Sequence, residues 1–115
     1  MKGINAMRRV VFLVGLLAAF PALAMTDSSA NIGTGASTPL AAASGTRSWV
    51  MLFNRSANNI WCSWTGTATV AGAGTFGLIG LGSNIVLSRP NLVPQEALSC
   101  IASGAGSGLT VLSVP

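Results

Sequence analysis

The chain has 115 residues, of which half are hydrophobic and only 7% are charged, and its formal net charge is +4. This length suffices for one small domain. The basic residues beyond position 24 are three scattered arginines, Arg47, Arg55 and Arg89, set against Asp27 and Glu96. Because binding to a phosphate backbone needs clustered cations, this composition argues against a nucleic-acid partner.

The first 24 residues have the three parts of an export signal. Basic residues at the start precede an apolar run from Val10 to Phe20, and small residues follow, ending in Ala24. We expect cleavage between Ala24 and Met25, which leaves no stable membrane span and predicts a protein in the periplasm, on the cell surface or outside the cell. A retained anchor is the alternative, although the run is shorter than the ~20 residues that a span needs.

Residues 25–46 consist mainly of Gly, Ala, Ser and Thr and contain no aromatic residue. Such a segment buries too little apolar area to offset the entropy of ordering its backbone. The sequence therefore predicts a flexible leader here. The alternative is that part of it becomes ordered as an extended arm on a neighbouring subunit.

From residue 47 the chain alternates between apolar and polar residues in short segments separated by turn residues. Residues 49–53 and 60–65 flank a polar turn and predict a hairpin, which 67–70 would extend. Further strands are predicted around Phe76, Leu78 and Leu81, and at residues 84–88, 97–102 and 109–114. The expected fold is all-β, a small antiparallel β-sandwich or barrel of about five to seven short strands spanning residues 47–115 after the flexible leader.

Two cysteines, Cys62 and Cys100, lie in the predicted domain. Disulfides persist in the oxidising compartments that exported proteins reach, so we expect a bridge between an early and a late strand. Two buried free thiols are the alternative. Without His or an acidic cluster, two cysteines do not complete a metal site.

The residue types that usually perform catalysis are almost absent beyond residue 24. The sequence has no His, and the single Asp and single Glu lie in the predicted leader and in a turn. A serine nucleophile has no base, and a pair of facing carboxylates is not available. We therefore expect a non-enzyme that uses no cofactor.

Three tryptophans and one arginine are the candidate binding residues: Trp49, Trp61, Trp64 and Arg55. An exposed indole stacks on sugar rings or anchors a protein contact, whereas the simpler interpretation is that all three cover the core. Trp61 and Trp64 are three residues apart and point to opposite faces of a strand, so at least one is expected in the core. Arg55 lies in the predicted hairpin turn.

The stretch from Asn58 to Val114 resembles a small β module found in structural proteins of bacteriophages and prophages. The resemblance is carried by hydrophobic and turn residues: Ile60-Trp61-Cys62-Ser63-Trp64-Thr65-Gly66, Ala71-Gly72-Ala73-Gly74-Thr75-Phe76, Val93-Pro94-Gln95-Glu96-Ala97-Leu98-Ser99-Cys100-Ile101-Ala102 and Leu109-Thr110-Val111-Leu112. It implies a virion-surface or tail-associated β-sandwich that works within an oligomer.

The leading hypothesis is thus an exported, non-catalytic β-sandwich with a structural or assembly role, of phage or prophage origin. Its partners would be further copies of the chain or other structural subunits, with virion association as one setting. The alternative is a secreted module that binds a glycan or envelope surface through an exposed Trp. A third hypothesis, an inhibitor or toxin-like peptide, rests only on size and the predicted disulfide.

Overall fold

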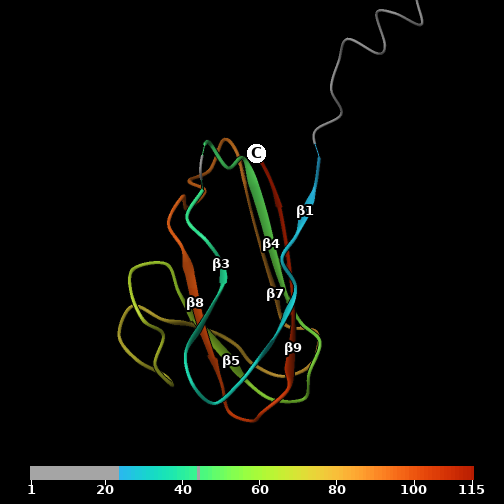
Figure 1. Ribbon diagram of the computed structural model, residues 1–115, viewed down its shortest axis with the longest axis vertical. Coiled ribbons are helices and arrows are strands. Elements are labelled where there is room, and N and C mark those ends of the chain that lie inside the picture. The colour runs from blue at the N-terminus through green and yellow to red at the C-terminus, as the bar shows by residue number, and fades with distance from the viewer. Residues whose placement is uncertain (1–23, 44) are drawn as a thin grey trace, which may run out of the picture.

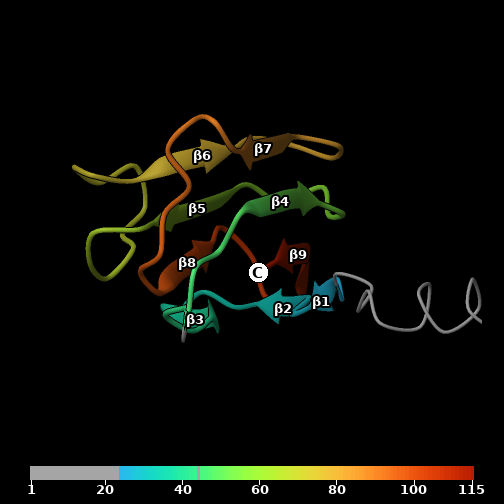
Figure 2. The same ribbon diagram turned by 90° about the horizontal axis from the view of Figure 1, so that it is seen from above.

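Nine β-strands in two antiparallel sheets make up the computed structural model, which describes residues 24–43 and 45–115 (Figures 1 and 2). The strands are β1 (Thr26–Asp27), β2 (Ala30–Ile32), β3 (Ser37–Leu40), β4 (Trp49–Asn54), β5 (Ile60–Ser63), β6 (Phe76–Leu78), β7 (Asn84–Ser88), β8 (Leu98–Ala102) and β9 (Ser107–Val114). The all-β prediction is confirmed, and the architecture is a sandwich. No helix in these residues has the length and apolarity needed to cross a membrane. The predicted signal, apart from Ala24, lies outside the described residues.

Sheet A contains β7, β4 and β9, with β1 and β2 pairing one after the other along the far edge of β9. Sheet B has the order β3-β8-β5-β6. Figure 2 shows the two sheets edge-on, with β6 and β7 at one end of the sandwich and β3, β2 and β1 at the other. Each sheet therefore has two edges, and β7 forms one of them.

The core lies between the sheets because the strands alternate strictly. In β9 every odd-numbered residue from 107 to 113 is buried, and in β4 the even-numbered residues 50, 52 and 54 are buried. The core side chains are aliphatic residues and the two cysteines, with Leu52, Ile60, Leu98, Leu109 and Val111 among those with no exposed surface. Alternation with a period of two buries one face of each sheet and leaves the other outside.

The segment predicted as a flexible leader is part of the sandwich. β1 and β2 pair with β9, and β3 pairs with β8, so residues 26–40 supply three strands beyond the predicted five to seven. Its few apolar side chains reach the core, where Ile32 and Leu40 are buried. The leader prediction was wrong because an edge strand gains stability mainly from backbone hydrogen bonds to the strand beside it, which side-chain composition does not reveal.

The predicted hairpin of residues 49–65 does not form, because β4 and β5 belong to different sheets. The connection between them is organised by the buried side chain of Asn54. Its Nδ2 donates to the carbonyls of Asn58 (2.7 Å) and Leu78 (2.9 Å), and its Oδ1 accepts from the Ser56 N–H (2.9 Å). These bonds hold the chain as it crosses from sheet A to sheet B. Residues 67–70, predicted to extend the hairpin, lie in a loop.

Candidate functional site

The outer face of sheet A carries a continuous row of apolar side chains on its three longest strands. We call it the apolar face. It comprises Trp49, Met51 and Phe53 of β4, Val86 of β7, and Leu112 and Val114 of β9. The antiparallel register aligns Val86, Met51 and Leu112 across the sheet, and Trp49 opposite Val114.

These side chains point away from the core, yet they are as apolar as the buried ones. The outer side of an antiparallel sheet that faces water is normally polar. Here Val86 has 49% of its surface exposed, and Trp49, Met51 and Phe53 are half-buried by one another and by their cross-strand neighbours. A contiguous apolar patch of this kind on a small domain indicates a contact surface.

One border of the apolar face is polar. The guanidinium of Arg55 lies over β9 at Gly108, where an added Cβ would come within 3.2 Å of its Cζ. Asp27 of β1 lies opposite Leu112. Hydrogen bonds from the Ser29 side chain and backbone N–H, aided by the Arg55 charge, hold the pKa of the Asp27 carboxyl below its ordinary value. The predicted binding residue Arg55 thus lies at the rim of the face and not at its centre.

The three tryptophans occupy three different environments. Trp49 belongs to the apolar face. Trp61 lies on the outer side of sheet B, opposite Gly77 and Ile101 in the neighbouring strands. Trp64 packs against the hydrophobic core. Neither Trp61 nor Trp64 is fully buried, and Trp64 lies just beyond the end of β5. The structure does not bring the three indoles together into one binding site.

Behind Trp64 lies Arg47, which the sequence did not single out. Its side chain is only 4% exposed and donates to the carbonyls of Pro94 (2.7 Å), Ala41 (3.0 Å) and Glu96 (3.4 Å). Its Cζ lies 5.8 Å from the centre of the Trp64 ring. Desolvation lowers the pKa of this guanidinium, and the negative charge of Glu96 partly opposes that effect.

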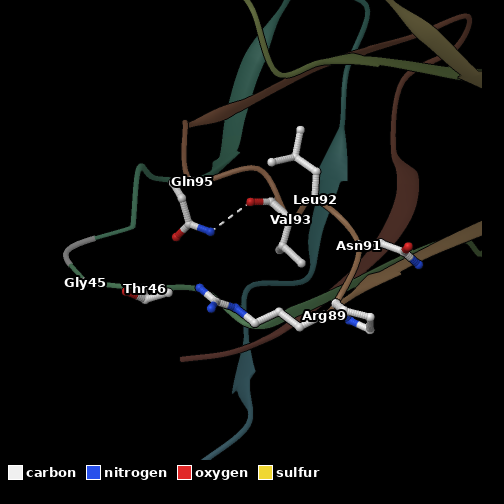
Figure 3. Close-up of a pocket in the computed structure, with 8 residues that line it drawn as sticks. Gly45, Thr46, Arg89, Asn91, Leu92, Val93 and Gln95 are labelled. Atoms are coloured by element: carbon white, nitrogen blue, oxygen red, sulfur yellow. Dashed lines mark hydrogen bonds between the residues drawn. The ribbon is translucent and has the colours of Figure 1, made fainter.

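The side chain of Gln95 completes the same cluster. Its Nε2 donates to the Val93 carbonyl (2.8 Å; Figure 3) and to the Arg47 carbonyl (2.9 Å). Its Oε1 accepts from the Arg47 N–H. The side-chain amide of Gln95 thus bonds both the N–H and the carbonyl of Arg47, as the backbone of a neighbouring β-strand would. Arg47 and Gln95 therefore fix residues 93–96 to the segment just before β4.

A shallow open depression of about 940 Å³ lies beside this cluster, at the same end of the sandwich (Figure 3). Its lining includes Thr46, Arg89, Asn91 and Gln95, together with Leu92, which is 88% exposed. Among the described residues, every buried side-chain N or O atom has a hydrogen-bond partner. The hydrogen-bonded polar groups at this end, the Arg47 guanidinium and the Gln95 amide, hold the loop and are not free for a ligand. The depression is open, and its remaining polar side chains, those of Thr46, Arg89 and Asn91, are exposed, so it offers a weaker site than the apolar face.

Cys62 and Cys100 form a disulfide, as predicted. They are directly opposed on the adjacent strands β5 and β8, with their Cα atoms 4.1 Å apart, and both are fully buried. The bridge joins neighbouring strands of one sheet on its core side. Such a bond is compatible with an exported protein. Ala24 and Met25, at the predicted cleavage point, are both exposed ahead of β1.

Comparison of the chain with known protein families, curated proteins and solved structures finds no match. The resemblance to phage structural modules therefore stays a prediction.

Proposed function

We propose that this chain is an exported, non-catalytic β-sandwich module that assembles with further copies of itself through the apolar face of sheet A. The observation that carries the proposal is the row formed by Val86, Met51 and Leu112, an apolar strip on the solvent side of a sheet. Covering such a strip with a second apolar surface removes it from water, at about 25 cal/mol per Å² of apolar area.

Charge supports self-association. The sequence holds only eight charged residues, and several of those fall within the first 24. Repulsion between two copies is therefore small, while Arg55 and Asp27 at the rim offer charges of opposite sign. A phage or prophage origin, and a place on or near a virion, belong to the same proposal and rest on the sequence resemblance.

The test is the molar mass of the exported protein, measured by size-exclusion chromatography with light scattering over a wide range of concentration. We expect the mass to rise with concentration. The variant Met51→Lys puts a charge at the centre of the apolar face and should weaken association at least tenfold. Ile101→Lys, at a half-buried position on the outer side of sheet B, is the matched control and should associate like the wild type. A wild type that stays monomeric throughout would refute assembly.

The second candidate function is a module that binds a glycan or envelope surface. Trp61 favours it, because its indole lies on the outer side of sheet B beside Gly77, which adds no side chain there. Titration with cell-wall fragments and polysaccharides, followed by tryptophan fluorescence, separates the two functions. A saturable shift that Trp61→Ala abolishes would favour binding over assembly.

A further inference from the structure

β7 is an end strand whose backbone is open on one side. Among residues 24–43 and 45–115 it pairs with β4 alone, and Figure 2 shows it at the end of sheet A. Two hydrogen bonds at its ends show which residues of β7 direct their backbone N–H and C=O groups toward β4. The Asn54 N–H donates to the Ser83 carbonyl (2.8 Å), and the Arg89 N–H donates to the Ser48 carbonyl (3.2 Å). In an antiparallel pair, backbone groups alternate between the two sides of the strand.

It follows that Ile85 and Leu87 point their backbone groups toward β4, whereas Asn84, Val86 and Ser88 point theirs outward. The Ser88 carbonyl already accepts a bond from the Asn91 N–H (3.0 Å), which leaves its N–H free to donate within the described structure. The strand carries no charged residue and no proline, and its register with β4 is unbroken. Charges, prolines and bulges are the features that normally protect an edge from pairing, and β7 has none of them.

We propose that two copies of the chain join β7 to β7 in antiparallel register about a twofold axis at Val86. This inference rests on the proposed function and names the contact by which assembly begins. Val86 and the partner's Val86 then exchange both backbone hydrogen bonds. Each Ser88 N–H donates to the carbonyl of the partner's Asn84. The outward groups of one strand are therefore complementary to those of its copy.

The side chains agree with this register. Val86 lies on the same side of the sheet as Met51, its cross-strand neighbour. Pairing at Val86 places the apolar faces of the two copies next to each other on one continuous sheet, so that the strip runs from one Leu112 to the other. The joined face is twice the size of the single one and is available for further assembly.

Charge also permits the pairing. Arg89, the nearest ionisable residue, follows Ser88 and lies three positions from the axis, opposite the partner's Ser83. The two Arg89 side chains are then about 20 Å apart at ~3.3 Å per residue, well beyond the ~8 Å Debye length at physiological salt. Pairing five-residue edges buries less than the roughly 1,200 Å² of a stable interface, so we expect a dimer with a Kd in the micromolar range or weaker.

Val86→Lys tests the contact, with Val70→Lys as its matched control. The two valines have similar exposed fractions, 49% and 55%, and Val70 lies in a loop outside the strands. Lys at position 86 sets two like charges directly opposite each other. In sedimentation velocity of the exported protein, Val86→Lys should weaken dimerisation at least tenfold, and Val70→Lys should leave it unchanged.

A cross-linking experiment tests the register. Val86→Cys should form an intermolecular disulfide under mild oxidation, because directly opposed residues of a hydrogen-bonded pair have Cα atoms ~5.5 Å apart, within disulfide range. Val70→Cys should not. Because Val86 also belongs to the apolar face, the cross-link is what separates the two proposals: if Val86→Cys does not cross-link to itself while the wild type associates and Met51→Lys does not, edge pairing is wrong and assembly through the face stands. If the wild type never associates, both proposals fail. If Val86→Cys cross-links to a different protein and not to itself, the partner at the β7 edge is not a second copy of this chain, and the proposal is wrong.

Discussion

At the scale of single residues, Arg47 shows how one buried charge holds two segments together. Its guanidinium serves three carbonyls at once, and Arg47→Met would leave those acceptors without a donor. We expect the variant to lose about 2–4 kcal/mol of unfolding free energy. Urea denaturation followed by tryptophan fluorescence measures the loss.

Arg55→Met is the control for this prediction, because it removes the same type of side chain from an exposed position. It should change stability by less than about 0.5 kcal/mol. Arg47→Lys keeps the charge but lacks the planar fork of donors, and it should recover only part of the loss. Equal stability for the two Met variants would show that the carbonyl contacts contribute little.

Asp27 gives the molecule a stability term that depends on pH. Its folded pKa lies below the unfolded value, mainly because the Ser29 side chain and N–H bond to the carboxylate. A depressed carboxyl pKa stabilises the fold above the unfolded pKa of about 4, and that contribution disappears as the pH falls through the folded value. Carboxyl NMR titration should show the lowered pKa, and Asp27→Asn should remove the corresponding part of the acid dependence. A titration at the ordinary value would contradict the hydrogen-bonding account.

The sequence could not reveal Arg47, because a lone arginine before a strand usually lies in solvent. Only the fold brings Gln95 and Trp64 to it. The disulfide could be predicted from the sequence, because the chain has a predicted export signal and two cysteines, and both cysteines lie in segments with the alternating pattern of strands. Of the three tryptophans, the alternation of side chains separated Trp61 from Trp64 but did not say which one faced the core.

At the scale of elements, the disulfide ties the two central strands of sheet B, β5 and β8, together. It closes a sequence separation of 38 residues, for which the chain-entropy model gives about 3–4 kcal/mol. The double variant Cys62→Ala/Cys100→Ala should lose at least that much stability in urea denaturation. A reductant should destabilise the wild type and leave the variant unchanged. A loss below about 1 kcal/mol would contradict this role.

The strands that alternation predicts are those with strong side-chain patterns. Residues 84–88 form β7 as predicted, and β4, β5, β8 and β9 agree within a few residues. The sequence analysis did not predict β1, β2 and β3, because Gly-, Ser- and Thr-rich segments form strands only where they can pair with the open edge of a sheet. The incorrect hairpin over residues 49–65 has a related cause. The local alternation of residues predicts where strands lie, but which strands pair depends on contacts between distant residues, such as those of Asn54.

At the scale of the whole molecule, a small sandwich with few charges has one outer face that resembles a core. The predicted β7 pairing covers the open edge of sheet A, and assembly through the apolar face covers its outer side, so together the two contacts remove the exposed parts of sheet A from water. Fold class followed from composition and alternation. The apolar face did not, because residues 49, 51 and 53 are as apolar as their buried neighbours and only the sheet arrangement decides which set points outward.

The most direct test is native mass spectrometry of the protein recovered from the cells or particles that make it. The account predicts chains that begin at Met25, each two hydrogens lighter than the reduced form, in complexes of two or more copies. A chain that keeps residues 1–24 with two free thiols, or a monomer at every concentration, would contradict it.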